Sequence, residues 1–353
     1  MKFSRTRAFL LSSVALATMH AYADGPSFYA LIDGGMASSK ISGGVAASAS
    51  KSEFITGGVV PTFAGLKFEK TVANLTVGVQ LEQGFTLNTP TGSSYYFFSN
   101  GGELLNRQKN IYIKSSAGNF VMGVQPNLAF KTVLMGDPRG GSNFGSSLAM
   151  IDANGGLGTV DYASFSYTSP TMSGFTLAGQ YVPESRTAVG EIKTGSRASA
   201  TYASGDLTLG LATYTSQVVA KKDSSGNILS ANYKLGSLTL KGITASQKTD
   251  TFTAALSTTG VGGSYALNDK TSLDAGYYKS TSNTRNFKVD TIAAGAYYNL
   301  TKELQLYGQY AVLNNNGSST SAWNFAGPSI ITGDLAAGQK AKTLNVGLIF
   351  SYF

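Results

Sequence analysis

The stretch KTLNVGLIFSYF, residues 342–353, decides the fold of this chain. Its residues alternate in type, as in an extended strand, because successive side chains point to opposite faces. One face carries Leu344, Val346, Leu348, Phe350 and Tyr352, and the other carries Asn345, Gly347, Ile349 and Ser351. An apolar strand with an unpaired edge is prone to aggregate. We therefore expect it to pair with a matching strand near the start of the chain, residues 28–38, so that the sheet closes into a barrel.

The composition agrees with a strand-rich protein. The chain has 353 residues, of which 42% are hydrophobic and 13% charged, and it contains 42 Gly, 19 Tyr and 19 Phe. Glycine and aromatic residues in these amounts favour many strands joined by turns. There is no Cys, so disulfides cannot stabilise the fold.

Residues 1–23 have the features of a cleaved signal peptide. Lys2, Arg5 and Arg7 form a positive start, residues 8–17 form an apolar middle, and residues 21–23 have the small-x-small pattern of a cleavage site. The apolar run is too short to span a bilayer. We expect residues 24–353 to form one exported barrel domain. An exported, Cys-free, strand-rich chain is either a secreted soluble β protein or an outer-membrane barrel.

Catalysis by the common triads is excluded by composition. The single His, His20, lies in the expected signal peptide. The mature chain therefore has neither His nor Cys, which rules out a Ser-His-Asp or Cys-His triad and any zinc site built on these residues. No Asp/Glu pair is singled out by its setting. We expect no catalytic residue, no metal and no cofactor.

Period-two segments recur along the whole chain. They predict about sixteen strands, most of them near the ~9–11 residues that cross a bilayer as a strand. The predicted strands are residues 28–38, 62–72, 74–87, 105–115, 120–130, 161–169, 174–182, 196–203, 206–217, 229–235, 237–247, 261–267, 271–279, 288–299, 303–313 and 342–353. Loops are expected at residues 34–56 and 88–104. Residues 131–158 break the pattern, and structureless loops of this length are usually functional or disordered.

Motifs along the chain resemble those of the Gram-negative general porins, in particular their β-proteobacterial branch. In order they are Tyr29-Ala30-Leu31-Ile32-Asp33, Gln80-Leu81-Glu82-Gln83-Gly84-Phe85, Asn106-Arg107-Gln108, Ala117-Gly118-Asn119-Phe120-Val121-Met122-Gly123-Val124-Gln125 and Val346-Gly347-Leu348. The resemblance implies a homotrimer of 16-stranded antiparallel transmembrane β-barrels in the outer membrane. It also implies that the third external loop, here residues 131–158, folds into the lumen. Val124 departs from the family, which commonly has Arg at that place.

Such a barrel would work as a passive channel for small hydrophilic solutes and ions. A barrel of this strand number encloses water, and charges at a narrow section filter solutes by sign. The expected wall cations are Lys67, Arg107, Lys109 and Lys131, the expected loop charges are Asp137 and Arg139, and Asp33 and Glu82 are further wall candidates. Lys67 falls on the face of its predicted strand that is expected to point into the barrel. Arg107 and Lys109 share the phase of Ile111 and Ile113, so they would need a bulge or a strand extending beyond the bilayer. The positive excess predicts a mild anion preference.

Other functions remain open at this point. A substrate-specific channel would need a row of aromatic residues or a dense charge track along the lumen. A structural or adhesive surface barrel would bind partners through long outer loops, and the loops here are of moderate length. A barrel enzyme lacks a nucleophile motif, because Asn143 stands where the hydrolase elbow has Ser. Nucleic-acid binding is disfavoured, since the cations are scattered rather than gathered in a patch.

Overall fold

The structure is a computed structural model of the chain. It describes residues 25–44, 48–87, 104–148, 150–151, 157–186, 192–218, 222–249, 254–282, 286–318, 321–322 and 334–353. The expected signal peptide and nearly all of the expected loop 88–104 lie outside these residues. Within them, no helix has the length and apolar character needed to cross a bilayer.

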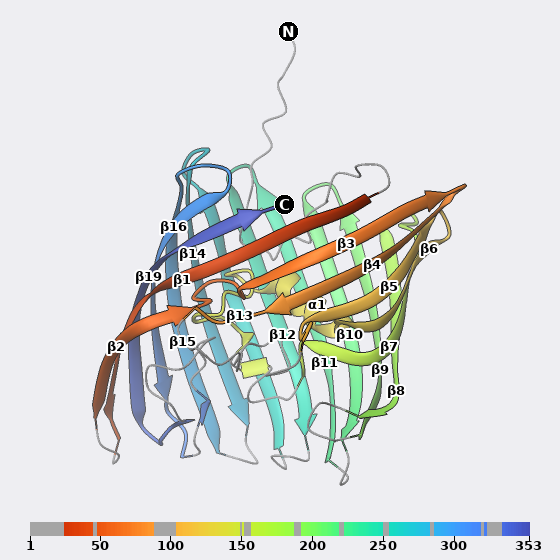
Figure 1. Ribbon diagram of the computed structural model, residues 1–353. Helices are drawn as coiled ribbons and strands as arrows, with labels where there is room; N and C mark the ends of the chain where they lie inside the picture. The colour runs from red at the N-terminus through yellow and green to blue at the C-terminus, as the bar shows by residue number, and fades with distance from the viewer. Residues whose placement is uncertain are drawn as a thin grey trace.

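The described chain forms one antiparallel sheet that closes on itself (Figure 1). Its strands are β1 (Gly25–Gly43), β2 (Ala49–Thr56), β3 (Phe63–Val72), β4 (Leu75–Gly84), β5 (Gln108–Ser115), β6 (Gly118–Pro126), β7 (Val160–Thr168), β8 (Phe175–Arg186), β9 (Ile192–Ser204), β10 (Leu207–Val218), β11 (Lys222–Leu235), β12 (Leu238–Thr249), β13 (Ala254–Ala266), β14 (Thr271–Ser282), β15 (Phe287–Asn299), β16 (Leu304–Asn315) and β19 (Gln339–Tyr352). A separate short ladder joins β17 (Ser321–Ala322) and β18 (Asp334–Leu335). The helix in these residues is α1 (Leu128–Gly136).

The first and last strands of the sheet close the barrel. The ladder between β1 and β19 runs from Ala30 opposite Tyr352 to Gly43 opposite Gln339. On its other edge, β1 pairs with two strands in line, first with β3 and then with β2. Because β2 and β3 share one place in the wall, the 17 strands of the sheet make a closed 16-strand barrel. The predicted strand number and the predicted closing pair are confirmed.

The two faces of the wall differ as the period-two pattern predicts. On β19, Leu344, Val346 and Leu348 are 51%, 49% and 45% exposed, whereas Thr343 and Asn345 are fully buried on the inner face. The same alternation recurs on the other strands, with large apolar side chains outside and mostly polar ones inside. An apolar outer band around a polar interior is the arrangement of a transmembrane barrel.

The connections at the two ends of the barrel differ in length. At one end, two-residue turns join β3 to β4, β9 to β10 and β11 to β12. Gly205 and Gly236 in two of these turns have φ of +57° and +58°, which glycine adopts without steric cost. The start of β1 and the end of β19 lie at this same end (Figure 1). We call this the short-turn end and the other the long-loop end.

Several predicted boundaries were wrong; for example, β11 and β13 each begin seven residues before the predicted strand. The loop expected at residues 34–56 is largely the second half of β1 together with β2. Small side chains on both faces, such as Ser38 and Ser39, hide the alternation there. The strand predicted for residues 120–130 ends at Pro126, and α1 begins at Leu128 within that predicted strand and runs to Gly136, into the segment 131–158 that was expected to be structureless.

Asn127 explains where α1 starts. Its side-chain oxygen accepts hydrogen bonds from the backbone N–H groups of Ala129 and Phe130, at 2.8 and 3.4 Å. These groups have no partner within a helix, and an N-cap Asn supplies one at a gain of about 1 kcal/mol. Pro126 just before it ends the strand ladder, because proline has no N–H to donate.

Candidate functional site

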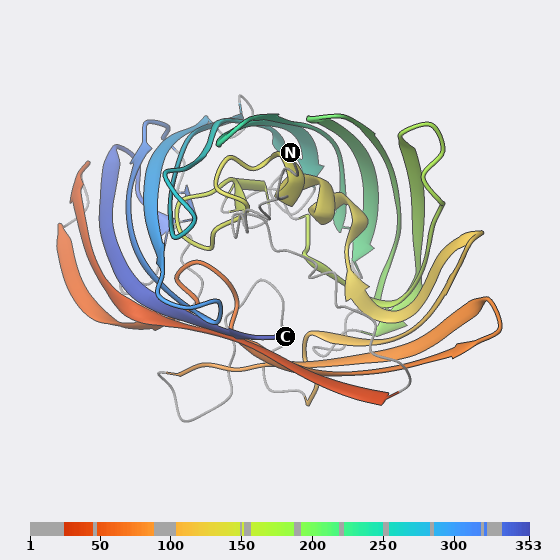
Figure 2. The same cartoon turned by 90° about the horizontal axis from the view of Figure 1, so that it is seen from above.

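A chain segment between β6 and β7 lies on the inner side of the ring of strands. It comprises α1 and the residues that follow, and we call residues 127–148 and 150–151 the inner segment. Figure 2 shows α1 inside the ring, next to the strands coloured green. Most of its contacts are with β10 and β11. The inner segment therefore covers one side of the inner wall, between β9 and β16.

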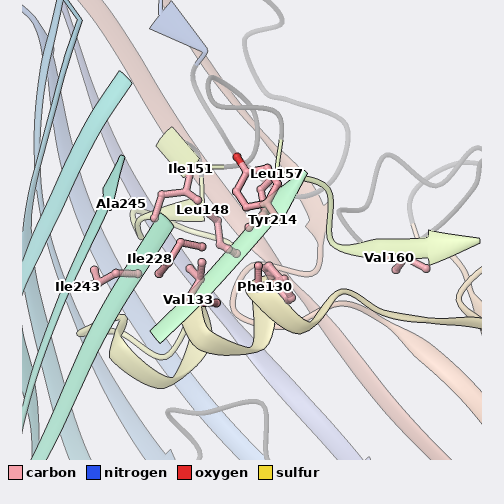
Figure 3. Close-up of a cluster of buried hydrophobic side chains, with 12 residues drawn as sticks. Phe130, Val133, Leu148, Ile151, Leu157, Val160, Tyr214, Ile228, Ile243 and Ala245 are labelled. Atoms are coloured by element: carbon pink, nitrogen blue, oxygen red, sulfur yellow. The ribbon is translucent and has the colours of Figure 1, made fainter. Parts of the chain in front are cut away.

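An apolar cluster holds the inner segment against this wall (Figure 3). Phe130 and Val133 of α1 are fully buried, as is Ile151 further along. They pack with inward side chains of three consecutive strands, Tyr214, Ile228 and Ile243. Burying a side chain of this size contributes about 1.5–3 kcal/mol. The wall is apolar where the inner segment covers it, although inner walls of such barrels are generally polar.

Asp137 organises the turn that follows α1. Its Oδ1 accepts hydrogen bonds from the backbone N–H groups of Arg139 and Gly141, at 2.8 and 3.0 Å. Its Oδ2 accepts from the N–H and the hydroxyl of Ser147, at 2.8 and 2.5 Å. Gly140 and Gly141 have φ of +65° and +74°, so the tight turn needs glycine at both places. The carboxylate thus ties the two arms of the turn together.

Arg139 joins the inner segment to strands β14, β15 and β16 of the covered wall. Its Nε donates to Oδ1 of Asp274 on β14 at 2.8 Å, and its Nη2 donates to Tyr297 on β15 and Gln309 on β16. Its Nη1 donates to the carbonyl oxygens of Phe144 and Gly145 in its own segment. The guanidinium therefore links three wall strands to the inner segment.

Burial changes the expected role of both loop charges. Asp137 is fully buried, and the Arg139 side chain is also 0% exposed and paired with Asp274. Neither offers its charge to water at a narrow section of the lumen. We expected these two charges to filter ions. Their position makes them anchors instead, because hydrogen-bonded and paired buried charges hold elements together.

The wall across the lumen, from β1 to β5, carries a different network. Tyr29 donates to Oε1 of Glu82 at 2.8 Å, and Gln80 donates to both groups. Arg107 Nε lies 3.3 Å from Oε2 of Glu82, and its guanidinium stacks over the ring of Phe63 at 4.2 Å. Arg107 is turned inward although its phase predicted the opposite, because it precedes the start of β5 and is not bound by that strand's alternation.

Lys67 has the inward position that its parity predicted. It is 8% exposed, and its Nζ lies 2.9 Å from Oε2 of Glu69 on the same strand. Lys114 on β5 reaches the other oxygen of Glu69 at 2.8 Å. The ring of Tyr112 lies beneath both ammonium groups. The two cations therefore share one carboxylate near the short-turn end.

Asp33 fixes the interruption between β2 and β3. Its Oδ2 accepts from the N–H groups of Val59 and Val60 at 2.7 and 2.9 Å, and its Oδ1 accepts from Tyr307 at 2.7 Å. Thr62 donates to the Asp33 carbonyl and accepts from its N–H. The residue is fully buried, so it holds the inward bend of residues 57–62.

The remaining two candidates differ in setting. Lys109 is half-buried in the outward phase of Ile111. Lys131 is half-buried on the opposite side of α1 from the buried Ala129 and Val133. Among the described residues, Lys131 has no ion-pair partner. Burial lowers the pKa of Lys131 below its ordinary value of 10.5.

Sequence reasoning missed the wall partners of the anchors. Asp274 and Gln309 lie on inward positions of β14 and β16, as their parity indicates, but nothing local marks them as partners of Arg139. It also missed a fully buried ion pair between Asp161 on β7 and Arg197 on β9, with Oδ1 and Nη2 2.7 Å apart. An inward charge on a predicted strand is the signal that could have found them.

A closed barrel with an apolar outer band, a polar inner wall and a covering inner segment defines a transmembrane β-barrel channel. A family model described as Gram-negative porin matches residues 10–318. The chain belongs to this family. It is an outer-membrane channel protein and not an enzyme.

Solved structures of porins share the fold. An anion-selective porin from Comamonas acidovorans has a TM-score of 0.77 at 19% identity, over 93% of this chain and 100% of that chain. Outer-membrane expressed OmpT of Vibrio cholerae has a TM-score of 0.65 at 14% identity, over 95% of this chain and 99% of that chain. OmpF of Salmonella typhi, solved with daunomycin, has a TM-score of 0.65 at 12% identity, over 95% of this chain and 100% of that chain. No curated protein matches the chain significantly.

Proposed function

We propose that this porin is a passive diffusion channel for small hydrophilic solutes and ions, with a mild preference for anions. Water fills the space that the wall leaves open, and flux runs downhill without chemistry. The inner segment takes up room on the β9–β16 side, so solutes are selected by size where they pass it. The hydrogen-bonded polar side chains around Tyr29 and Glu82 are of the kind that line water-filled barrels, although these two are themselves only 4% and 3% exposed.

The observation that carries the anion preference is the pairing of the inward cations. Lys67, Arg107, Arg139 and Arg197 each lie within ion-pair distance of a carboxylate, and the inward, buried Lys241 interacts with the charges of Asp137 and Asp274. Lys131 has no such carboxylate among the described residues. A paired charge acts at a distance as a dipole, whose field falls off faster than that of a lone charge. Lys131 therefore contributes most to the potential that a passing ion meets.

The test is the reversal potential of single channels in a potassium chloride gradient. We expect chloride to be favoured in the unchanged protein. Lys131→Met should lower the chloride-to-potassium permeability ratio about two- to fourfold, the size of a screened Coulomb interaction at ~5 Å. Lys131→Glu should lower it further. Lys70→Met is the matched control, because Lys70 is exposed on the outward face of β3.

Three outcomes would each contradict one part of the proposal. A channel that prefers potassium would refute the anion preference. An unchanged permeability ratio in Lys131→Met would remove Lys131 as its source. Protein that inserts without conducting would refute passive diffusion itself.

We also propose that three copies assemble through the outer face of β2–β7. The strands β3 to β7 are the shortest full strands of the wall, and outward side chains there include Phe68, Val77 and Ile111. One similar structure, OmpT of Vibrio cholerae, is described as a trimer form. Replacing Phe68 and Ile111 by Ala should lower the temperature at which the trimer dissociates. The matched change of Leu209 and Leu211 on β10 should leave it unaltered.

Residues 1–23 are proposed to be removed on export. Their positive start, apolar middle and small-x-small end support this. The intact mass of protein purified from outer membranes tests it, since cleavage after Ala23 predicts a chain that begins at Asp24. A mass that includes Met1 would contradict it.

A further inference from the structure

A second stretch of chain leaves the wall on the inner side of the ring. It is the inward bend of residues 57–62, which connects β2 to β3 (Figure 2). Gly57 has a φ of +74°, which glycine adopts without steric cost. Pro61 has no N–H group to donate to a neighbouring strand. These two residues favour a break in the ladder, so the chain between β2 and β3 turns into the barrel.

The wall beneath the inward bend holds it by polar and apolar contacts. Asp33 on β1 accepts a hydrogen bond from the backbone N–H of Val59 at 2.7 Å. Val59 is also buried in an apolar cluster that includes Tyr307 on β16. From the same strand, Gln309 donates to the carbonyl oxygen of Gly58 at 3.1 Å. The bend is therefore fixed to strands that lie on both sides of the closing pair β1–β19.

The inward bend also meets the inner segment. The backbone N–H of Asn143 donates to the carbonyl oxygen of Val59 at 2.9 Å, and its Nδ2 donates to the carbonyl oxygen of Gly57 at 3.0 Å. Gln309 links both from the wall, because its Oε1 accepts from the hydroxyl of Ser142 at 2.9 Å while its Nε2 donates to the bend. The bend and the inner segment are therefore parts of one hydrogen-bonded structure inside the barrel.

Two apolar side chains stay partly exposed on this structure. Val60 is half-buried, whereas the other five residues of the bend are buried. Phe63, the first residue of β3, is also half-buried and lies on the inward face, where the Arg107 guanidinium stacks over its ring. Both pack at the edge of the cluster around Val59, so their exposed parts face the lumen. Inner walls of water-filled barrels are generally polar, which makes an apolar pair at this place unusual.

We propose that the inward bend is a second constriction element, in which Val60 and Phe63 border the solute path and Asn143 fixes the bend to the inner segment. The inference rests on the proposed channel function and goes beyond it, because size selection depends on two inward segments rather than one. Neither apolar side chain can replace the water around an ion or a polar solute, so solutes pass this section hydrated. The volume of the two side chains therefore limits the hydrated size that passes.

The test uses the absence of cysteine from the chain, which makes each introduced thiol unique. Val60→Cys and Phe63→Cys are treated with two methanethiosulfonate reagents, which carry an ethyltrimethylammonium or an ethylsulfonate group. We expect both reagents to label both variants, seen as a mass shift. Either label should lower single-channel conductance about twofold, because it adds bulk at a narrow section. The cationic label should raise the chloride-to-potassium permeability ratio, and the anionic label should lower it.

Two variants serve as matched controls. Val59→Cys changes the neighbouring residue, which is 6% exposed, and Leu66→Cys changes a residue on the outward face of β3. Neither should lose conductance after treatment. Val60→Ala should raise conductance, which tests the bend without a thiol.

The contradicting results are distinct from those that test the channel itself. Labelled Val60→Cys and Phe63→Cys channels with unchanged conductance would overturn the inference and leave passive diffusion intact. Equal labelling rates in Val59→Cys and Val60→Cys would also overturn it, because the bend would then have no fixed exposed side. Unmodified protein that inserts without conducting would refute the channel and this inference together.

The role of Asn143 is tested by the reactivity of Val59→Cys. Adding Asn143→Ala removes the hydrogen bond to Gly57, so the bend should open more often. The thiol should then react about fivefold faster, the population change that follows the loss of one ordinary hydrogen bond. Asn110→Ala is the matched control, because this buried asparagine of β5 donates to the carbonyl oxygen of Val124, away from the bend. An equal increase in both backgrounds, or none in either, would overturn the role of Asn143.

Discussion

The two sides of the lumen are built differently. From β10 to β16 the strands have 12–14 residues, and their inner face is covered by the inner segment. From β3 to β7 they have 8–10 residues, and their inner face carries linked polar and charged groups such as Glu82 and Arg107. The covered side holds its segment with an apolar cluster and a buried ion pair, whereas the other side pairs its own charges. A buried charge in this wall can therefore tie a separate segment to the strands, as Arg139 does, or link neighbouring strands to each other, as Glu82 and Arg107 do.

The largest effect should come from breaking the anchor on the covered side. Arg139→Met leaves Asp274 buried without its cation, which typically costs about 3–5 kcal/mol. We expect a lower urea midpoint in lipid vesicles, followed by circular dichroism, together with a larger and noisier single-channel conductance. Arg139→Met/Asp274→Asn should recover part of the stability, because no uncompensated charge remains. Unchanged conductance in the single variant would mean that the apolar cluster holds the inner segment without Arg139.

A smaller effect should follow from crowding the uncovered side. The Tyr29 ring lies over Gly65, where an added Cβ would be 2.3 Å from Tyr29 Cζ. Gly65→Ala should therefore displace the ring from Glu82 and cost about 1–3 kcal/mol by overpacking. Gly179→Ala on β8 is the matched control, since no atom lies within 4 Å of its Cβ position. Equal urea midpoints for the two variants would show that Tyr29 moves aside freely.

Removing one hydroxyl from the same network should have a milder result. Tyr29→Phe deletes the donor to Glu82, which still receives hydrogen bonds from Gln80 and Arg107. We expect a loss of about 1 kcal/mol in the free energy of unfolding. The Tyr112 hydroxyl is buried and has no hydrogen bond within the described residues, so the companion variant Tyr112→Phe should change less. A larger loss in Tyr112→Phe than in Tyr29→Phe would contradict the assignment of the Tyr29 bond.

The smallest expected effect is a pH dependence of ion selectivity. Burial lowers the pKa of Lys131, so its charge is lost at a lower pH than that of an ordinary lysine. The chloride preference should therefore decline with rising pH before ordinary lysines titrate, and Lys131→Met should show no decline over that range. Reversal potentials at a fixed salt gradient measure both. A parallel decline in the variant would assign the titration to another group.

Much of the barrel could be predicted from the alternation of apolar and polar residues alone, because each strand shows this period of two in its own sequence. The side on which Lys67 lies and the pairing of the first strand with the last both follow from it. Asn127 after Pro126 is a sequence signal for the start of a helix. It was overlooked because the first residues of α1 are apolar, like those of the strand before them. The role of Arg139 could not be read, because its partner Asp274 is 135 residues away and becomes a neighbour only when the barrel closes.

The unbroken ladder between β1 and β19 has a consequence for biogenesis. Almost the entire polypeptide must be delivered before its two end strands can meet, so a chain halted before Gln339 would present two open edges to its surroundings. Such edges recruit other unpaired strands. The barrel can therefore close only after the residues of β19 have been delivered. We expect truncated products to be degraded or to aggregate rather than to insert as smaller barrels.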